Sequence, residues 1–293
     1  MREECKGVRC AIVPPADRCS APRFSAMMTP CAGASDAFSD APVSPSDAPV
    51  SPGLSLSRLF GSLALLPLLA LQAQITRRRV PRLASAKPPH HGTIAGVGRP
   101  IRILAMGESS VSGIGLASGE ETVAAATARS LARLTNRPAT WRTQGRSGAT
   151  VREGIDYLLP CLASEPADLL IVAFGVNDVM ALRSPSRFAD DLKEFISTAR
   201  NRIGSEAAVV VGGVAPVHSF PALRSPLSNV LGWWADALQA AAEGLSRRLP
   251  RLVVERLPPR LEPERFAVDG FHTNAGAHAL WGEDIAALAM PLL

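Results

Sequence analysis

The chain changes character near residue 100, where short apolar runs begin to alternate with longer stretches of mixed apolar and polar residues. Runs that are apolar throughout predict strands buried on both faces, and the mixed stretches predict helices. The predicted strands are residues 101–106, 139–143, 168–174, 207–214 and 252–255, and the predicted helices are residues 122–134, 150–162, 186–203, 227–249 and 275–288. This alternation predicts an α/β protein, a three-layer α/β/α sandwich around a parallel sheet with right-handed crossovers.

The first 100 residues lack this alternation. Residues 1–53 are rich in Ala, Ser, Pro and Asp and contain a tandem repeat of Ser-Asp-Ala-Pro-Val-Ser-Pro. Such a composition buries too little apolar surface to order the chain, so we expect a disordered tail. Residues 54–79 form an apolar segment, and residues 80–100, with Pro, Gly and two adjacent histidines, are expected to be a linker. The globular domain is therefore predicted to span residues 101–293.

The strongest apolar run of the N-terminal region, residues 59–75, has two interpretations. It is short for a bilayer span, which needs about 20 apolar residues, and Pro67 interrupts it. The arginines at 77–79 follow the run, whereas a secretory signal has its positive charges before it. One interpretation is an anchor with the arginines and the domain on the cytoplasmic face, at the inner side of the cell membrane. The other is a helix packed on the domain, or a segment lying at the membrane surface.

The charge and the cysteine content of the chain indicate which kinds of ligand and partner are not expected. The formal net charge is +5, but the positive surplus lies in the first 100 residues, and the rest of the chain is nearly neutral and has no basic stripe interleaved with aromatics. Nucleic-acid binding is therefore not expected. Four of the five cysteines lie in the N-terminal tail without the paired spacing of a zinc site, and Cys161 stands alone in the domain. We accordingly expect no disulfide framework, no metal and no cofactor.

Small and polar residues follow each predicted strand. Ser109 comes directly after the first strand, Gly148 lies in the stretch after the second, and Asn177 follows the third. Because the carboxyl ends of parallel strands share one edge of the sheet, we expect these residues to border one crevice. A glycine N–H and an amide side chain can donate to the oxygen that gains negative charge in acyl transfer. Each residue taken singly is more commonly a turn or helix-cap residue.

A second polar cluster lies near the C-terminus, where Asp269 precedes His272 by three residues. A serine hydroxyl is a poor nucleophile until a base removes its proton, and a carboxylate can orient that base, so this pair is a candidate partner for Ser109. His218 and Phe220 follow the fourth strand and are expected to border the same crevice as candidate substrate contacts. His218 is also a rival base, although its loop lacks an accompanying acid.

Four blocks of residues occur in the order that identifies a known family. They are Gly107-Glu108-Ser109, Gly148, Gly175-Val176-Asn177-Asp178 and Asp269-Gly270-Phe271-His272. In this order the chain resembles the SGNH (GDSL-type) hydrolases over about residues 101–293. The resemblance implies a flavodoxin-like sandwich and an esterase, lipase, thioesterase or deacetylase activity without a metal.

The resemblance also implies roles for individual residues. Ser109 would be the nucleophile, and His272 would be the base, oriented by Asp269. The N–H of Ser109 would join Gly148 and Asn177 in the oxyanion hole. One short loop carrying both Asp269 and His272 would fix the imidazole tautomer, with the second ring nitrogen facing Ser109.

Two positions depart from the family pattern. Glu108 stands where the family usually has Asp; it keeps the charge and adds a methylene, so the hydrogen bonds that support the nucleophile turn can differ. Glu108 is also a candidate substrate contact. Gln144 stands where Asn is common, a change that concerns turn geometry more than chemistry.

The sequence therefore predicts a serine ester hydrolase that forms an acyl-enzyme with a small-molecule or lipid ester, and it does not distinguish lipid, short acyl and thioester substrates. The alternative is a non-catalytic, flavodoxin-like binding or signalling domain. Such a domain would need clustered acidic residues and a metal at the strand ends, whereas Glu108 and Asp178 stand singly beside Ser and Asn.

Overall fold

A computed structural model describes residues 66–293 of the chain. Its centre is a six-stranded sheet in the order β1-β3-β2-β4-β5-β6. The strands are β1 His91–Ile94, β2 Ile101–Gly107, β3 Ala139–Gly145, β4 Leu169–Ala173, β5 Ala208–Val211 and β6 Leu252–Val254. All neighbours from β3 to β6 pair in parallel, and β1 runs antiparallel to β3 at the edge.

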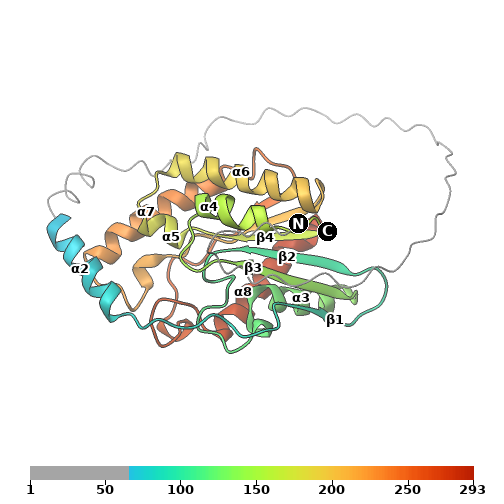
Figure 1. Cartoon of the computed structure of the whole chain (residues 1–293), viewed down its shortest axis with the longest axis horizontal. Helices are drawn as coiled ribbons and strands as arrows, with labels where there is room; N and C mark the ends of the chain where they lie inside the picture. The colour runs from blue at the N-terminus through green and yellow to red at the C-terminus, as the bar shows by residue number, and fades with distance from the viewer. Residues whose placement is uncertain (1–65) are drawn as a thin grey trace, which may run out of the picture. The chain divides into compact units, whose positions relative to one another are not determined.

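Helices cover both faces of this sheet (Figure 1). The main helices are α3 Val123–Thr135, α6 Pro185–Ile203, α7 Leu227–Glu243 and α8 Ala275–Ala289, with short α4 Val151–Glu153 and α5 Val176–Met180 between them. Along β2, Ile103 and Ala105 belong to the core shared with α3 and α8, whereas Leu104 and Met106 belong to the core shared with α6 and α7. This alternation of faces confirms the predicted three-layer sandwich.

The helices α3 and α8 lie side by side on one face of the sheet, and a glycine sets how closely they approach. A Cβ atom added at Gly282 of α8 would lie 2.4 Å from the Cβ atom of Ala126 on α3. A side chain at this position would therefore force the two helices apart. Because Gly282 has no side chain, α8 can pack closely against α3.

Part of the predicted linker is a strand. Residues 91–94 form β1, in which His91 pairs with Arg142 and Ile94 with Ala139. The expectation of a linker over residues 80–100 was wrong for this segment because an edge strand is only half-covered. Its short, mostly polar sequence alternates between exposed and half-buried positions and has no apolar run to indicate it.

The helix predicted over residues 150–162 is present as a continuous helical stretch, 151–161, but it is less regular than expected. α4 ends at Glu153, and a π-helical turn, Gly154–Leu158, and a 3₁₀ turn, Leu159–Cys161, follow it. Gly154 lies against the rings of Phe174 and Phe195, which leave no room for a side chain at this position. Pro160 lacks the backbone N–H that a continuing helix would need.

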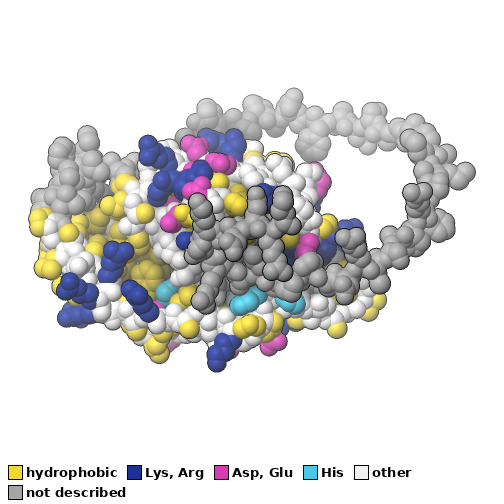
Figure 2. All heavy atoms as spheres, in the orientation of Figure 1, with side chains coloured by type: hydrophobic (Ala, Val, Ile, Leu, Met, Phe, Trp, Pro, Cys, Tyr) yellow, Lys and Arg dark blue, Asp and Glu magenta, His cyan; other side chains and the backbone are white. Residues whose placement is uncertain are grey.

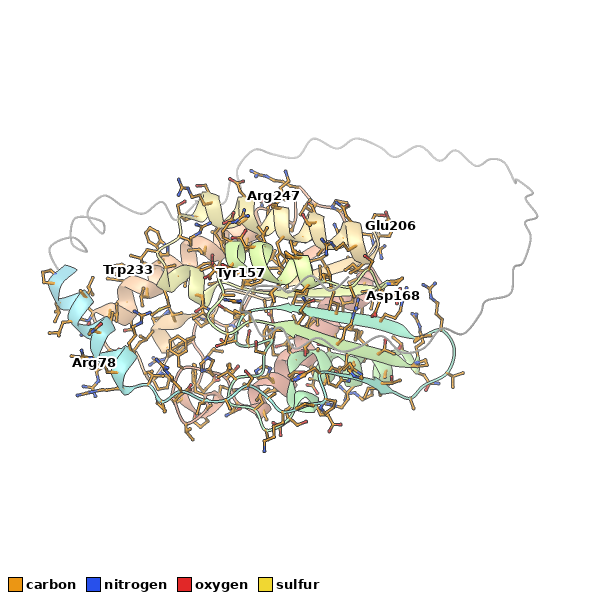
Figure 3. All side chains as sticks on the ribbon, viewed as in Figure 1. Arg78, Tyr157, Asp168, Glu206, Trp233 and Arg247 are labelled. Atoms are coloured by element: carbon orange, nitrogen blue, oxygen red, sulfur yellow. The ribbon has the colours of Figure 1, made fainter. Side chains whose placement is uncertain are left out.

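The helix α2, Leu66–Arg79, contains the described part of the apolar segment and packs against α7. Leu69 is buried, and the Gln72 side chain donates to the Ser225 carbonyl and accepts from the Leu227 N–H. Figure 2 shows hydrophobic and arginine side chains together on the α2 end, and Figure 3 labels Arg78 on α2 and Trp233 on α7. Residues 59–65 and the predicted disordered tail, 1–53, lie outside the described residues.

Candidate active site

Ser109 follows β2 in a tight turn whose entry requires glycine. A Cβ atom at Gly107 would lie 2.1 Å from the carbonyl oxygen of Ala173, so only glycine lets β2 approach the end of β4 this closely. The next N–H, that of Glu108, donates to the same Ala173 oxygen at 2.9 Å. The chain then turns back, because the N–H groups of Val111 and Ser112 both donate to the Glu108 carbonyl. Ser109 is thereby half-buried at the carboxyl edge of the sheet.

Asp269 and His272 form a compact acid–imidazole unit on one loop. The Asp269 Oδ2 atom lies 2.6 Å from His272 Nδ1, and Oδ1 accepts from the N–H groups of Phe271 and His272 at 2.9 and 3.0 Å. Gly270 turns the loop with a φ of +63°, which glycine adopts readily. Burial by itself raises the pKa of Asp269, but the hydrogen bonds from His272 and Phe271 outweigh it and hold the pKa below its usual range. Asp269 is therefore an anion that fixes the imidazole by one nitrogen.

Ser109 and His272 line the same cavity, which has a volume of about 320 Å³. The cavity lies at the carboxyl edge of the sheet, between the residues that end β4 and follow β5 and the first turns of α8. Most of its wall is apolar, including Phe174, Val176, Phe220, Leu257, Leu261 and Phe271. A largely apolar pocket with a few polar groups at one place is typical of a site for a small organic ligand.

Glu108 is buried, and its carboxylate accepts hydrogen bonds from the residues that follow β4. Oε1 accepts from the N–H of Val176 at 3.1 Å, and Oε2 accepts from the backbone N–H and the side-chain amide of Asn177 at 3.0 and 2.5 Å. Burial raises the pKa of Glu108 to about 7 against these hydrogen bonds. The residue borders the cavity, but its carboxylate oxygens bind the protein.

The two residues predicted to complete an oxyanion hole lie beside this carboxylate. The Asn177 amide donates to Glu108 and, at 3.3 Å, to the carbonyl of Ala149, so both of its hydrogens have protein acceptors. Gly148, next to Ala149, is exposed and has a φ of +80°. Neither Gly148 nor Asn177 is among the described residues that line the cavity. To donate to a substrate, Asn177 must release one of its two present acceptors.

Of the two predicted contacts after β5, only Phe220 borders the cavity. Its ring packs edge to face on Phe266 and Phe271, with centroids 5.1 and 5.2 Å apart. His218 is exposed and lies over Gly232 of α7, where an added Cβ atom would come within 3.0 Å of its Nδ1 atom. His218 is not among the described residues that line the cavity, and its roles as a substrate contact or a rival base stay predictions.

Several cavity residues on α8 were not predicted from the sequence. Ala277, Leu280 and Trp281 line the cavity at the three- and four-residue spacing of one helix face. His278, also at the wall, is buried, and burial lowers its pKa to about 4, so the ring is neutral. Its Nε2 atom lies 3.2 Å from the Thr273 hydroxyl oxygen. The signal in the sequence was the predicted helix over residues 275–288, which begins three residues after His272.

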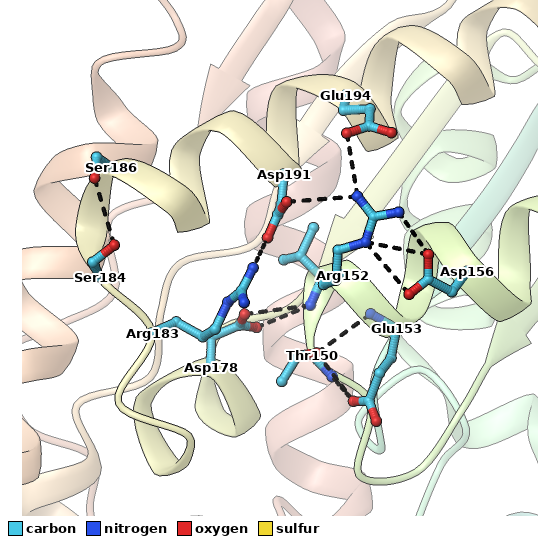
Figure 4. Close-up of polar contacts among 11 residues, drawn as sticks. Thr150, Arg152, Glu153, Asp156, Asp178, Arg183, Ser184, Ser186, Asp191 and Glu194 are labelled. Atoms are coloured by element: carbon cyan, nitrogen blue, oxygen red, sulfur yellow. Dashed lines mark hydrogen bonds and ion pairs between the residues drawn. The ribbon is translucent and has the colours of Figure 1, made fainter.

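Asp178, the last residue of the third block, lies in a separate polar cluster (Figure 4). Its carboxylate accepts from the N–H of Val151 at the start of α4, and burial raises its pKa to about 7. Nearby, Arg183 pairs with Asp191, and Arg152 pairs with Asp156. Among residues 66–293, no group of three or more His, Cys, Asp or Glu side chains is arranged to hold a metal ion.

Comparisons with known proteins agree with this geometry. The model of the GDSL-like lipase/acylhydrolase family matches residues 105–280. A GDSL-like esterase, Rv1075c of Mycobacterium tuberculosis, is 28% identical over 244 residues, which cover 76% of each chain. Two solved structures share the fold: the lipase Lip_vut3 from a goat rumen metagenome has a TM-score of 0.53 at 15% identity and covers 64% of this chain and 97% of its own. TesA has a TM-score of 0.52 at 20% identity, with 66% and 99% covered.

Proposed function

Because the chain belongs to the GDSL-like lipase/acylhydrolase family and is a hydrolase of ester bonds, we propose that it works through an acyl-enzyme formed on Ser109. The observation that carries the proposal is the shared cavity of Ser109 and His272, with Asp269 bound to Nδ1 of the imidazole. Family membership favours this hydrolase over the alternative of a non-catalytic binding or signalling domain.

In the proposed reaction the Ser109 hydroxyl oxygen attacks the acyl carbonyl carbon while His272 Nε2 takes the hydroxyl proton. The imidazolium then returns this proton to the leaving alcohol, and the ester bond breaks. Water, deprotonated by the same nitrogen, then attacks the acyl carbon. The bond to the Ser109 oxygen breaks, the imidazolium returns the proton to that oxygen, and the acid leaves. Asp269 is suited to its part because its three hydrogen bonds keep it ionised beside the imidazolium that forms.

We assign the oxyanion hole to the N–H groups of Ser109 and Gly148 and the amide of Asn177. The weaker of the two Asn177 hydrogen bonds is the 3.3 Å contact with the Ala149 carbonyl, since the other joins a carboxylate at 2.5 Å. In the proposed transition state this weaker bond is exchanged for one to the oxyanion. Glu108 then keeps the amide in place throughout the exchange.

The test of the nucleophile is Ser109→Ala with short p-nitrophenyl esters as substrates. The variant is expected to lose turnover by several orders of magnitude and to lose labelling by a fluorophosphonate, because no other group would form the acyl-enzyme. Ser205→Ala, an exposed serine in the turn before β5, is the matched control and should keep full activity. Normal hydrolysis by a folded Ser109→Ala variant would overturn the assignment.

The outer face of α2 favours an additional proposal, attachment to an anionic membrane surface. Leu68, Leu71 and Ile75 are exposed on a helix that is held to α7 by its other side, and Arg77, Arg78 and Arg79 end the helix. No helix in residues 66–293 is long and apolar enough to cross a bilayer. We propose that the leucines enter the headgroup region while the arginines bind anionic lipids, which are abundant on the cytoplasmic leaflet.

Vesicle sedimentation tests this attachment. The full chain is expected to sediment with phosphatidylserine vesicles and to stay in the supernatant with pure phosphatidylcholine. Replacing the three arginines by Gln should reduce binding about tenfold or more, since each basic residue near the surface contributes about 1 kcal/mol. An unchanged bound fraction in this variant, or equal binding to both lipids, would refute the proposal.

A further inference from the structure

Trp281 is held in one position on the carboxyl edge of the sheet. Its indole Nε1–H donates to Oε2 of Glu255 at 2.7 Å, and the same oxygen accepts from the N–H of Gly213 at 3.1 Å. The ring lies over Gly212, where an added Cβ atom would come within 2.9 Å of the indole Cζ2 atom. The glycine after β5 thus makes room for the indole, and the carboxylate fixes its rotation.

Burying Glu255 at this position lowers the stability of the fold. It is 3% exposed, its Oε1 atom has no hydrogen-bond partner among the described residues, and burial raises its pKa to about 7. A buried carboxyl group that lacks a full set of partners reduces stability. The contacts that it does make fix the side chain of Trp281 and the backbone of Gly213, both of which line the cavity.

The indole of Trp281 lies between the cavity and part of the hydrophobic core. On one side, Trp281 lines the cavity together with Ala173 and Gly213 at the ends of β4 and β5. On the other side, it packs against the core between the sheet and helices α3 and α8, which includes Val210 and Ile285. A smaller side chain at this position would therefore extend the cavity toward that core.

We propose that Trp281, fixed by Glu255, is the floor of the acyl pocket and sets the longest acyl chain that the enzyme accepts. The inference rests on the proposed function, since it takes the cavity beside Ser109 and His272 as the acyl site. The volume of about 320 Å³ is roughly twice that of an engineered apolar cavity of about 150 Å³ that holds benzene. A cavity of this size favours esters of medium-length acyl groups as substrates.

The test is a chain-length profile for wild type, Trp281→Ala and Trp281→Phe with p-nitrophenyl esters from acetate to palmitate. Trp281→Ala is expected to raise the ratio of kcat/KM for palmitate to that for butyrate by about tenfold or more, because added pocket depth accepts methylenes that the indole excludes. Trp281→Phe keeps an aromatic ring in the packing and is the variant that disturbs the fold less. It should give a smaller shift in the same direction. Trp233→Ala, on α7 outside the cavity lining, is the matched control and should keep the wild-type profile.

Variants of Glu255 test the role of the hydrogen bond. Glu255→Gln retains an acceptor for the indole and is expected to keep the wild-type profile. Glu255→Leu removes the acceptor, frees the indole and should broaden the profile toward long chains. Identical profiles in wild type and in folded Trp281→Ala and Trp281→Phe would overturn the proposal, as would a profile of Glu255→Leu that matches that of Glu255→Gln.

Binding separates the failure of this proposal from failure of the proposed function. Calorimetric titration of saturated fatty acids from hexanoate to palmitate into Ser109→Ala, with and without Trp281→Ala, measures pocket depth without turnover. A shift toward longer acids in the double variant supports the floor even if Ser109 is not the nucleophile. Equal affinities in the two proteins for every acid would refute the floor even if esters are hydrolysed at Ser109.

Discussion

Glu108 and Asp269 are two carboxylates with nearly the same set of ligands and opposite pKa shifts. Each accepts two backbone N–H groups and one side-chain nitrogen from nearby residues, Asn177 for Glu108 and His272 for Asp269. Burial raises the pKa of both, but the hydrogen bonds overcome it only at Asp269.

The difference comes first from burial, which disfavours the Glu108 anion more strongly, and then from the charge of the surroundings. Asp269 faces an imidazole that can become a cation, whereas Glu108 faces a neutral amide and is closer to the negative charge of Asp178. Hydrogen bonds of equal number therefore do not decide whether a buried carboxyl is ionised. Asp269 is arranged to stabilise positive charge as it develops, and Glu108 is arranged to hold a loop.

The largest effect is expected from Asp269→Asn, which keeps the shape and removes the charge. Without the anion the imidazole loses both its tautomer preference and its stabilisation as a cation, so kcat should fall about 10⁴-fold. Steady-state hydrolysis of p-nitrophenyl butyrate checks this. The control is Asp236→Asn, an exposed aspartate on α7, which should leave kcat unchanged. A loss of less than tenfold would show that Asp269 does not serve the reaction.

A smaller loss is expected from Glu108→Gln. Above pH 7, where Glu108 is ionised, its two oxygens accept three N–H hydrogens; the Gln amide has an acceptor at only one of these positions, so the loop carrying Asn177 is displaced. The expected fall in kcat is about 10- to 100-fold, less than for outright loss of an oxyanion donor. Glu108→Asp keeps the charge but loses reach to the Asn177 amide and should fall between wild type and Glu108→Gln. If Glu108→Gln is as damaging as Asp269→Asn, Glu108 takes part in proton transfer.

The smallest predicted effect is on the pH dependence of stability. Glu108 keeps its proton to about pH 7 in the folded chain but only to about 4.5 in the unfolded chain, so its contribution to stability falls as the pH rises through this window. Asp269 has the opposite sign: its contribution is lost as the pH falls through its lowered folded pKa, below the ordinary value of 3.8.

Urea unfolding across this range checks the sign. Between pH 4.5 and 7 the free energy of unfolding of Glu108→Gln should fall less steeply than that of wild type, by up to about 1.4 kcal/mol per pH unit. Asp178 and Glu255 shift the wild-type curve in the same direction, so the difference between the two proteins isolates Glu108. Parallel curves for the two proteins would contradict the raised pKa.

Most of the fold could be predicted from the sequence because the central strands are buried on both faces. The apolar runs at β2, β4 and β5 stand out for that reason, and the sandwich, the family and the ester-hydrolase activity predicted from them and from the four blocks are confirmed. β1 was missed because a half-exposed edge strand needs no apolar run. The helical stretch predicted over 150–162 is present, but its π and 3₁₀ turns were not predicted, because Gly154 packs on two phenylalanine rings that are distant in sequence.

In the candidate site, too, some contacts could be predicted from the sequence and others only from the folded chain. Asp269 and His272 are three residues apart, so a single loop brings them together and their spacing suffices to predict the contact. The amide of Asn177 is bound by Glu108, 69 residues away, and only a folded chain shows which acceptors it has. The pair of Glu255 and Trp281 likewise depends on a glycine in a third segment. The catalytic roles themselves stay predictions until the variants are measured.

The close contact at Gly282 has a consequence for altering this enzyme. His272 lies in the loop before α8 and Trp281 lies in the middle of the helix, so the close contact of α8 with α3 fixes the position of the proposed floor. Shifting α8 to admit a bulkier molecule would disrupt its close packing on α3. Room for bulkier substrates must therefore come from replacing individual side chains by smaller ones while α8 keeps its position.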